Sequence, residues 1–180
     1  MARVIAASDP AYGELFNAIE RSWFRLEALQ RYSADADLCR IVALGRPLPR
    51  QDGPWYDMLR THAAAGRSLH RVHIVEEPHD PYITFELAAY RDTTAAGEDV
   101  RIVPTPAGDW PVGLPRHDFW ILDEDQVWTL LYDDNGALEA AEQVIGPDEI
   151  AMHQHWAATA WRAAVPWAEY LPGVGLRQPI

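Results

Sequence analysis

Hydrophobic and polar positions follow a strand-like pattern at residues 69–75 and 99–103, and a helix-like pattern between these two runs. Both runs are rich in β-branched residues, which is typical of buried strands. In the helix-like segment, Asp80 can cap the free amides, Pro81 fits the first helical position, and Gly97 follows the last turn. A strand, a helix and a second strand in this order predict a parallel strand pair.

The same kind of pattern predicts a helix before this unit and a meander after it. Residues 54–66 begin at a proline, place apolar residues on one face and end at a glycine. Residues 118–145 predict three antiparallel strands, because turn signals interrupt them at 123–125 and at 134–136, the latter Asp-Asn-Gly. A closing helix is predicted over residues 147–165.

The chain is predicted to form a single domain over residues 1–180. Residues 1–53 are interpreted as an N-terminal arm and loops, with apolar residues such as Phe24 and Leu26 packed on a core that residues 54–170 build. The predicted fold class is α/β, with helices packed on a mixed sheet. In this sheet the parallel strand-helix-strand unit is extended by the antiparallel meander.

The charge of the chain narrows the classes of partner. A formal net charge of -12 argues against direct binding of nucleic acid, whose phosphates require a cationic surface. The sequence shows no signal peptide, no run of about 18 apolar residues, and one cysteine, Cys39, which cannot form an internal disulfide. We therefore expect a cytoplasmic protein whose partners are proteins or small molecules.

Polar residues gather just after the first predicted strand. Glu76, Glu77, His79 and Asp80 lie where an α/β sheet places ligands, at the carboxyl end of a strand and beside a helix N-terminus. They are candidates for a ligand site or an acid/base pair. The alternative is a purely structural role for these residues. Asp80 then only caps the helix, and Glu76 and Glu77 point to opposite sides of an extended chain.

Two further candidates lie within that strand. Alternation places Arg71 and His73 on one face of the sheet. A half-buried arginine needs an anionic partner, and Glu86 and Glu98 are the carboxylates predicted to supply it. A histidine inside a strand is more often a hydrogen-bonded core residue than a catalyst.

His117, just before the meander, is the last candidate. The order strand, helix, strand, His-x-Phe and hairpin is similar to one half of a phospholipase D-like protein, distantly and in degenerate form. That family's motif, His-x-Lys followed by Asp, implies an imidazole that attacks phosphorus and a lysine that holds phosphate oxygens. Here Phe119 stands at the lysine position and Glu124 at the aspartate position. The resemblance therefore implies the fold and counts against that chemistry.

No metal site and no cofactor is predicted. His153 and His155 are two residues apart on a helix, so they point in different directions and cannot share a metal ion. The sequence has no phosphate-binding glycine loop, no dinucleotide motif and no zinc spacing. Cys39 lacks the basic surroundings that a nucleophilic thiol requires.

Several blocks together resemble domain of unknown function family 6879 (DUF6879). The most specific are FELAAYRDTTAAGED and DFWILDEDQVW, and the likeness extends over nearly the whole chain. Members belong to filamentous high-GC Gram-positive bacteria and commonly lie beside genes for helix-turn-helix regulators. This resemblance implies a regulatory or protein-binding role and brings no catalytic residues with it.

The expected function is a non-catalytic regulatory or ligand-responsive interaction module of the cytoplasm that acts with a neighbouring regulator. Its pocket is expected between residues 76–80, Arg71, His73 and His117, with the Trp110 loop as a cover.

Two alternatives stay open. One is an enzyme acting on a small molecule, with His73 or His117 as general base and Glu76 or Glu77 as its orienting partner. The other is a purely structural subunit with a large self-association surface. A closed concave pocket with an imidazole and a carboxylate in hydrogen-bond reach would favour the enzyme.

Overall fold

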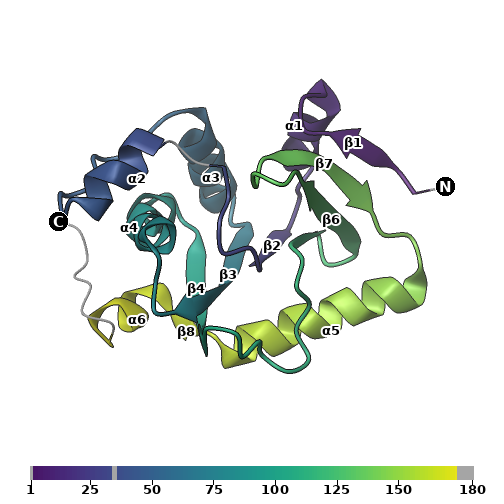
Figure 1. Cartoon of the computed structure of the whole chain (residues 1–180). Helices are drawn as coiled ribbons and strands as arrows, with labels where there is room; N and C mark the ends of the chain where they lie inside the picture. Colours follow the sequence, from purple (N-terminus) through teal and green to yellow (C-terminus); the bar gives the residue numbers. More distant parts are fainter. Residues whose placement is uncertain (1, 34–35, 174–180) are drawn as a thin grey trace.

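The part of the chain that the structure describes forms a mixed sheet of eight strands with helices on both faces (Figure 1). This computed structural model describes residues 2–33 and 36–173; residues 1, 34–35 and 174–180 of the predicted domain lie outside the described residues. The strands are β1 (Val4–Ala6), β2 (Ser22–Glu27), β3 (Ser68–Glu77), β4 (Asp99–Pro106), β5 (Phe119–Leu122), β6 (Gln126–Tyr132), β7 (Leu138–Gln143) and β8 (Val165–Pro166). The helices are α1 (Pro10–Asn17), α2 (Ala36–Ala43), α3 (Pro54–Ala64), α4 (Pro81–Ala95), α5 (Pro147–Ala163) and α6 (Trp167–Gly173). The strand order is β1-β7-β6-β5-β2-β3-β4-β8, which confirms the predicted mixed α/β class.

The predicted parallel unit is confirmed. β3 and β4 pair in parallel from His70 opposite Asp99 to Glu77 opposite Pro106, and α4 connects them. The Asp80 carboxylate accepts the backbone N–H of Ile83 at 2.7 Å, as expected of an N-cap. Local signals were sufficient to predict this unit, because the helix cap, the proline at the start of the helix and the alternation along the strands each involve residues that are close in the sequence.

The interpretation of the N-terminal residues as an arm is corrected by β2. This strand lies in the middle of the sheet, parallel to β3 and antiparallel to β5. Its residues alternate between the two faces, with Trp23 in one hydrophobic cluster and Leu26 in another. Such a strand is covered on both faces, so it forms part of the core instead of packing on it.

The meander and the closing helix are confirmed, and the sheet edges add elements that were not predicted. β5, β6 and β7 are antiparallel neighbours, and β5 joins them to β2. β1 pairs with β7 at one edge, and β8 pairs with β4 at the other. These strands are three and two residues long, too short for a periodic pattern to reveal.

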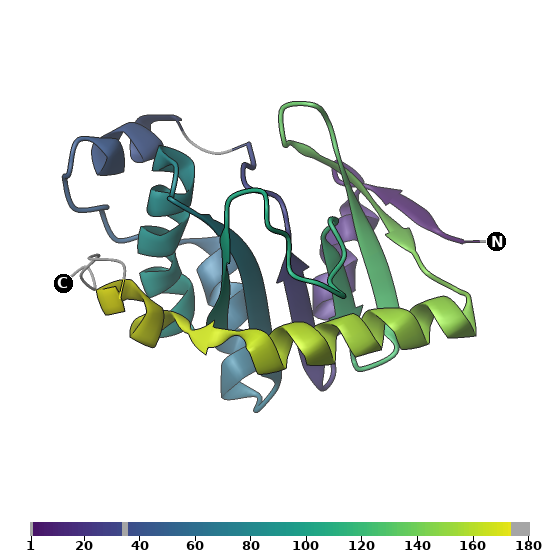
Figure 2. The ribbon, with the colours of Figure 1, turned by 60° about the horizontal axis from the view of Figure 1, so that its bottom comes forward.

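Helices cover the two faces of the sheet unequally. α5 lies along one face, where it contacts β2, β4, β5 and β6 (Figure 2). The other face carries two hydrophobic clusters, one built with α1 and α3 and the other with α4 and α6. Residues of β3 on this face belong to both, Leu69 to the first and Val75 to the second. The strand residues between Leu69 and Val75 on this face are Arg71 and His73.

The turn after α4 yields the first testable prediction. Gly97 has φ +107°, and a Cβ there would lie 2.4 Å from the Cβ of Ala63 in α3. Gly66 also has a positive φ, but a Cβ there would meet open space. In urea denaturation, Gly66→Ala should cost about 1–2 kcal/mol of unfolding free energy from backbone strain. Gly97→Ala should lose about 1–3 kcal/mol more from overpacking. Equal losses of unfolding free energy in the two variants would show that α3 does not pack closely against the turn at Gly97.

Candidate functional site

The centre of the sheet holds two arginines side by side. Arg25 in β2 and Arg71 in β3 are register partners on neighbouring parallel strands, on the face opposite α5. Both are almost fully buried. Two buried guanidinium groups at adjacent positions repel each other, so the fold requires carboxylates close to both.

Glu98 supplies the first of these carboxylates. It follows the Gly97 turn, and it accepts hydrogen bonds from Arg25 Nη2 and, at 3.2 Å, from Arg71 Nε. Burial alone would raise the pKa of Glu98, but the two arginines outweigh it and hold the pKa below its ordinary value. Arg25 is further held over the rings of Trp23 and Trp55, at 4.4 and 5.2 Å from their centroids.

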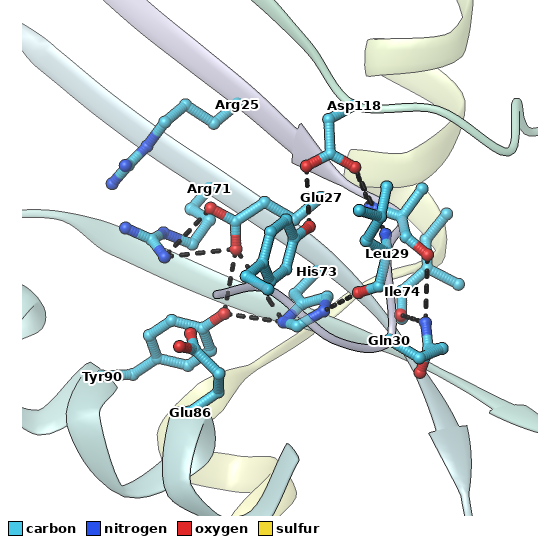
Figure 3. Close-up of polar contacts among 12 residues, drawn as sticks. Arg25, Glu27, Leu29, Gln30, Arg71, His73, Ile74, Glu86, Tyr90 and Asp118 are labelled. Carbon is cyan, nitrogen blue, oxygen red and sulfur yellow. Dashed lines mark hydrogen bonds and ion pairs between the residues drawn. The ribbon is translucent and has the colours of Figure 1, made fainter. Parts of the chain in front are cut away.

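Glu27 supplies the second carboxylate and extends the network (Figure 3). Its Oε1 lies 3.1 Å from Arg71 Nη1, and its Oε2 accepts the Tyr90 hydroxyl at 3.0 Å. The His73 ring has Nδ1 2.7 Å from the Tyr90 oxygen and Nε2 3.2 Å from the Leu29 carbonyl. Burial opposes ionisation of Glu27, yet Arg71, then His73 and Arg25, lower its pKa. Both nitrogens of His73 are thus engaged within the protein.

Asp118, just before β5, organises the neighbouring segment. Its carboxylate accepts the backbone N–H of Ala28 at 2.7 Å and the hydroxyls of Tyr32 and Tyr132 at 2.7 and 2.8 Å. The residue is fully buried, and burial raises its pKa despite these hydrogen bonds. Asp118 therefore links Ala28 and Tyr32, which follow β2, to Tyr132 at the end of β6.

A cleft of about 400 Å³ opens above these groups. Residues of β2 and β3 form its floor, and residues of α2 and α4 and of β5, β6 and β7 line its sides. The lining residues are Arg25, Glu27, Tyr32, Ser33, Leu38, Arg71, Tyr82, Phe85, Glu86, Trp120, Leu130, Tyr132 and Leu138. Burial raises the pKa of Tyr32, Tyr82 and Tyr132, and nearby carboxylates add to this, so their hydroxyls stay protonated at neutral pH. The cleft therefore offers aromatic faces and paired charges.

Of the predicted site residues, Arg71 and His73 lie in this network. Glu98 is confirmed as a partner of Arg71, whereas Glu86 accepts the Tyr82 hydroxyl at 2.7 Å. Glu27, and not Glu86, is the second carboxylate that pairs with Arg71. It reaches Arg71 because β2 lies beside β3, whereas the sequence had been interpreted as placing the residues of β2 in an N-terminal arm.

Glu77 and His79 lie elsewhere, beside α6. The Tyr170 hydroxyl donates to Glu77 at 2.6 Å, and His79 Nε2 lies 2.6 Å from the same oxygen. A hollow of about 470 Å³ adjoins them. Burial lowers the pKa of His79 more than Glu77 and Asp80 raise it. Glu76 is held through its backbone N–H, which donates to the Gln30 side chain at 2.9 Å.

His117 lies on the α5 face of the sheet. Its ring centroid is 5.7 Å from those of both His153 and Trp156 in α5. Burial, and secondly His153, lower the pKa of His117. Trp110 packs in the hydrophobic cluster of this same face, so its loop does not cover the Arg71 network. The structure thus divides the predicted pocket among three places instead of bringing its residues together.

Arg25, Glu27, Asp118 and the cleft tyrosines were missed by sequence reasoning. A signal existed for two of them, because the alternation in SWFRLE places Arg25 and Glu27 on one face of a strand. Asp118 gave no comparable signal, since its partners Ala28 and Tyr32 lie 90 and 86 residues away.

The described residues present neither a metal-binding group nor a helix that could cross a membrane. Among residues 2–33 and 36–173, no group of three or more His, Cys, Asp or Glu side chains is arranged to hold a metal ion. None of the helices within those ranges has both the length and the apolar character that crossing a bilayer would require.

The two arginines yield the second prediction. Glu98→Gln leaves them with one carboxylate, so the unfolding free energy should fall by about 3–5 kcal/mol in urea denaturation. The matched control is Asp99→Asn, because the neighbouring Asp99 is half-exposed and pairs with Arg101 at the surface. It should change stability by less than about 1 kcal/mol. A loss for Glu98→Gln no larger than that of the control would contradict the network.

Comparison with solved structures shows the fold, and comparison with family models shows the family. The crystal structure of a phospholipase D family member, Nuc from Salmonella typhimurium, matches with a TM-score of 0.53 and 13% identity. The match covers 92% of this chain and 97% of that one. At this identity the likeness establishes a shared phospholipase D-like fold and nothing about activity. No curated protein matches the chain. The family model of DUF6879, a domain of unknown function, matches residues 10–172, and the chain belongs to this family.

Proposed function

We propose that this protein is a non-catalytic regulatory module that binds a small ligand in the cleft above the Arg25–Arg71 network. One observation carries the proposal: a cleft of about 400 Å³ lies over charged groups that already pair with one another. Such a floor is rigid and preorganised, which suits binding. It leaves few groups available for chemistry on a bound molecule.

The side chains at the cleft argue against catalysis. His73 is fully buried and both its ring nitrogens have partners, so neither can take a proton from a ligand. The tyrosines keep their hydroxyl protons, since burial raises their pKa. Phosphoryl transfer of the phospholipase D type would need a lysine near His117, but Phe119 stands there and the sequence contains no lysine.

The walls of the cleft suggest how a ligand could alter the protein. One wall belongs to α2 and α4 and the other to the β5–β7 meander, with Tyr32 and Ser33 between them. A ligand that contacts both walls binds best to one spacing between them. It would shift the population of that arrangement by its difference in affinity.

A basic protein is the partner class that we propose for this module. The net charge of -12 favours association with a positively charged surface, such as that of a helix-turn-helix regulator, and disfavours direct contact with DNA. A role beside such a regulator implies the cytoplasm.

A small-molecule enzyme remains the second candidate, at a different place. His117 and His153 line a separate cavity of about 400 Å³ on the α5 side, together with Glu142 and Glu149. His153 is buried, its Nδ1 lies 2.7 Å from the Glu149 carbonyl, and its Nε2 has no partner among the described residues. An imidazole nitrogen held in this way could act as a base.

The third prediction tests the cleft. Ser33 is exposed and lines its mouth, so Ser33→Trp should fill it. In a ligand-observed NMR screen of small-molecule fragments, compounds that bind the wild type at the cleft should lose binding to this variant. Ser68→Trp is the control, because Ser68 is exposed and lines a groove on the α5 face. Fragment binding that survives Ser33→Trp, or a screen without any cleft binder, would count against the proposal.

The fourth prediction separates the module from the enzyme. The protein should not hydrolyse bis(p-nitrophenyl) phosphate above the rate of buffer, and His117→Ala should leave that background unchanged. The reason is the absence of a cation to stabilise phosphoryl charge beside His117. Turnover that His117→Ala or His153→Ala removes would favour the enzyme instead.

A further inference from the structure

Three tyrosine rings form a continuous aromatic wall around the cleft. The centroid of Tyr32 lies 5.5 Å from that of Tyr132 and 6.2 Å from that of Tyr82. All three line the cleft. Their hydroxyls are directed to carboxylates, Tyr32 and Tyr132 to Asp118 and Tyr82 to Glu86. The hydroxyls are thus engaged, so a ligand would contact mainly the rings, and the faces of aromatic rings attract cations.

The charges around the cleft have the sign that a cation needs. Arg25 and Arg71 are matched by Glu27 and Glu98, which are their ion-pair partners. Glu86 is then a carboxylate in excess. It is half-buried in α4, where it accepts the neutral Tyr82 hydroxyl, and its charge also acts on Arg71, which already forms ion pairs with Glu27 and Glu98. Asp118, fully buried, likewise accepts hydrogen bonds from neutral groups alone within residues 2–33 and 36–173.

An anionic or a neutral ligand would use this lining less well. An anion would meet arginines whose charge Glu27 and Glu98 already balance, beside the additional carboxylate of Glu86. A neutral apolar ligand would take water away from that half-buried carboxylate and add no positive charge beside it. A substituted ammonium group suits both the carboxylate and the aromatic rings of the lining. Its charge pairs with Glu86, and its alkyl groups pack against the rings.

We propose that the cleft binds a small organic cation of the substituted-ammonium class, held by the Tyr32–Tyr82–Tyr132 wall and the Glu86 carboxylate. This inference rests on the proposed function, that the cleft is a small-ligand site, and names the class of ligand. The volume of about 400 Å³ limits the ligand to a small molecule.

Three probes of one shape and different charge test the class. They are choline, its neutral analogue 3,3-dimethylbutan-1-ol, and the anionic analogue 3,3-dimethylbutanoate. In amide NMR titrations of the full chain, choline should shift resonances of α4 and of residues 28–33. It should bind about tenfold or more tightly than either analogue.

Two variants with a matched control locate the interaction. Glu86→Gln keeps an acceptor for the Tyr82 hydroxyl and removes the charge, and it should weaken choline binding by about tenfold or more. Tyr132→Leu removes one ring of the wall and should act in the same direction. Glu14→Gln removes the same charge from the exposed face of α1 and should leave binding unchanged.

The outcomes separate the ligand class from the proposed function. Equal or tighter binding of the neutral or the anionic analogue at the cleft would overturn the cation and leave a small-ligand site in place. Choline binding that Glu86→Gln and Tyr132→Leu do not weaken would overturn the assigned residues. No binding of any of the three probes at the cleft would overturn this inference, and the fragment screen with Ser33→Trp would then decide whether the cleft takes ligands at all.

Discussion

Two buried arginines on adjacent strands are the constraint on which this structure depends. Arg25 and Arg71 lie opposite each other in the parallel pair of β2 and β3, on a face that helices cover. Their charges are almost fully withdrawn from water, so they must be compensated inside the protein. Glu98 reaches them because the chain turns at Gly97, and this turn is tight because α3 presses on it through Ala63. Glu27 completes the set from β2 itself.

The same network separates two apolar clusters and leaves a cleft above it. Trp23 and Leu69 lie in the cluster beside α1 and α3, and Val75 lies in the cluster beside α4. Between them the floor is ionic and the walls are aromatic. The fold is shared with a phospholipase D family member at 13% identity, and a shared fold does not carry an activity with it. The proposed function therefore rests on the cleft and not on the fold.

Local patterns predicted those parts of the fold that neighbouring residues determine. The Asp80 cap, the pairing of β3 with β4 and the β5–β7 meander each depend on a few consecutive residues. β2 was misinterpreted because its surroundings in the sequence resemble a loop-rich arm, although its alternation was visible. β8 is two residues long and ends at Pro166, and α6 begins at the next residue, so neither leaves a periodic signal.

The site was less predictable than the fold, since long-range contacts build it. The alternation of β3 identified Arg71 and His73, and the need for an anion identified Glu98. The hydrogen bond between Arg25 and Glu98 spans 73 positions, and that between Glu27 and Tyr90 spans 63. Such pairs depend on the order of strands in the sheet, which no local pattern fixes.

The ionisation of Glu27 and Glu98 tests this account most directly. The carboxyl carbons of both residues can be followed by NMR while the folded protein is titrated with acid. The account predicts that both have a pKa below the ordinary 4.5, because the arginines outweigh burial. Both groups then stabilise the fold above that value, and the stabilisation is lost as pH falls through their folded pKa. A pKa above 4.5 for either glutamate would show that burial prevails, and that the two arginines are not held as described.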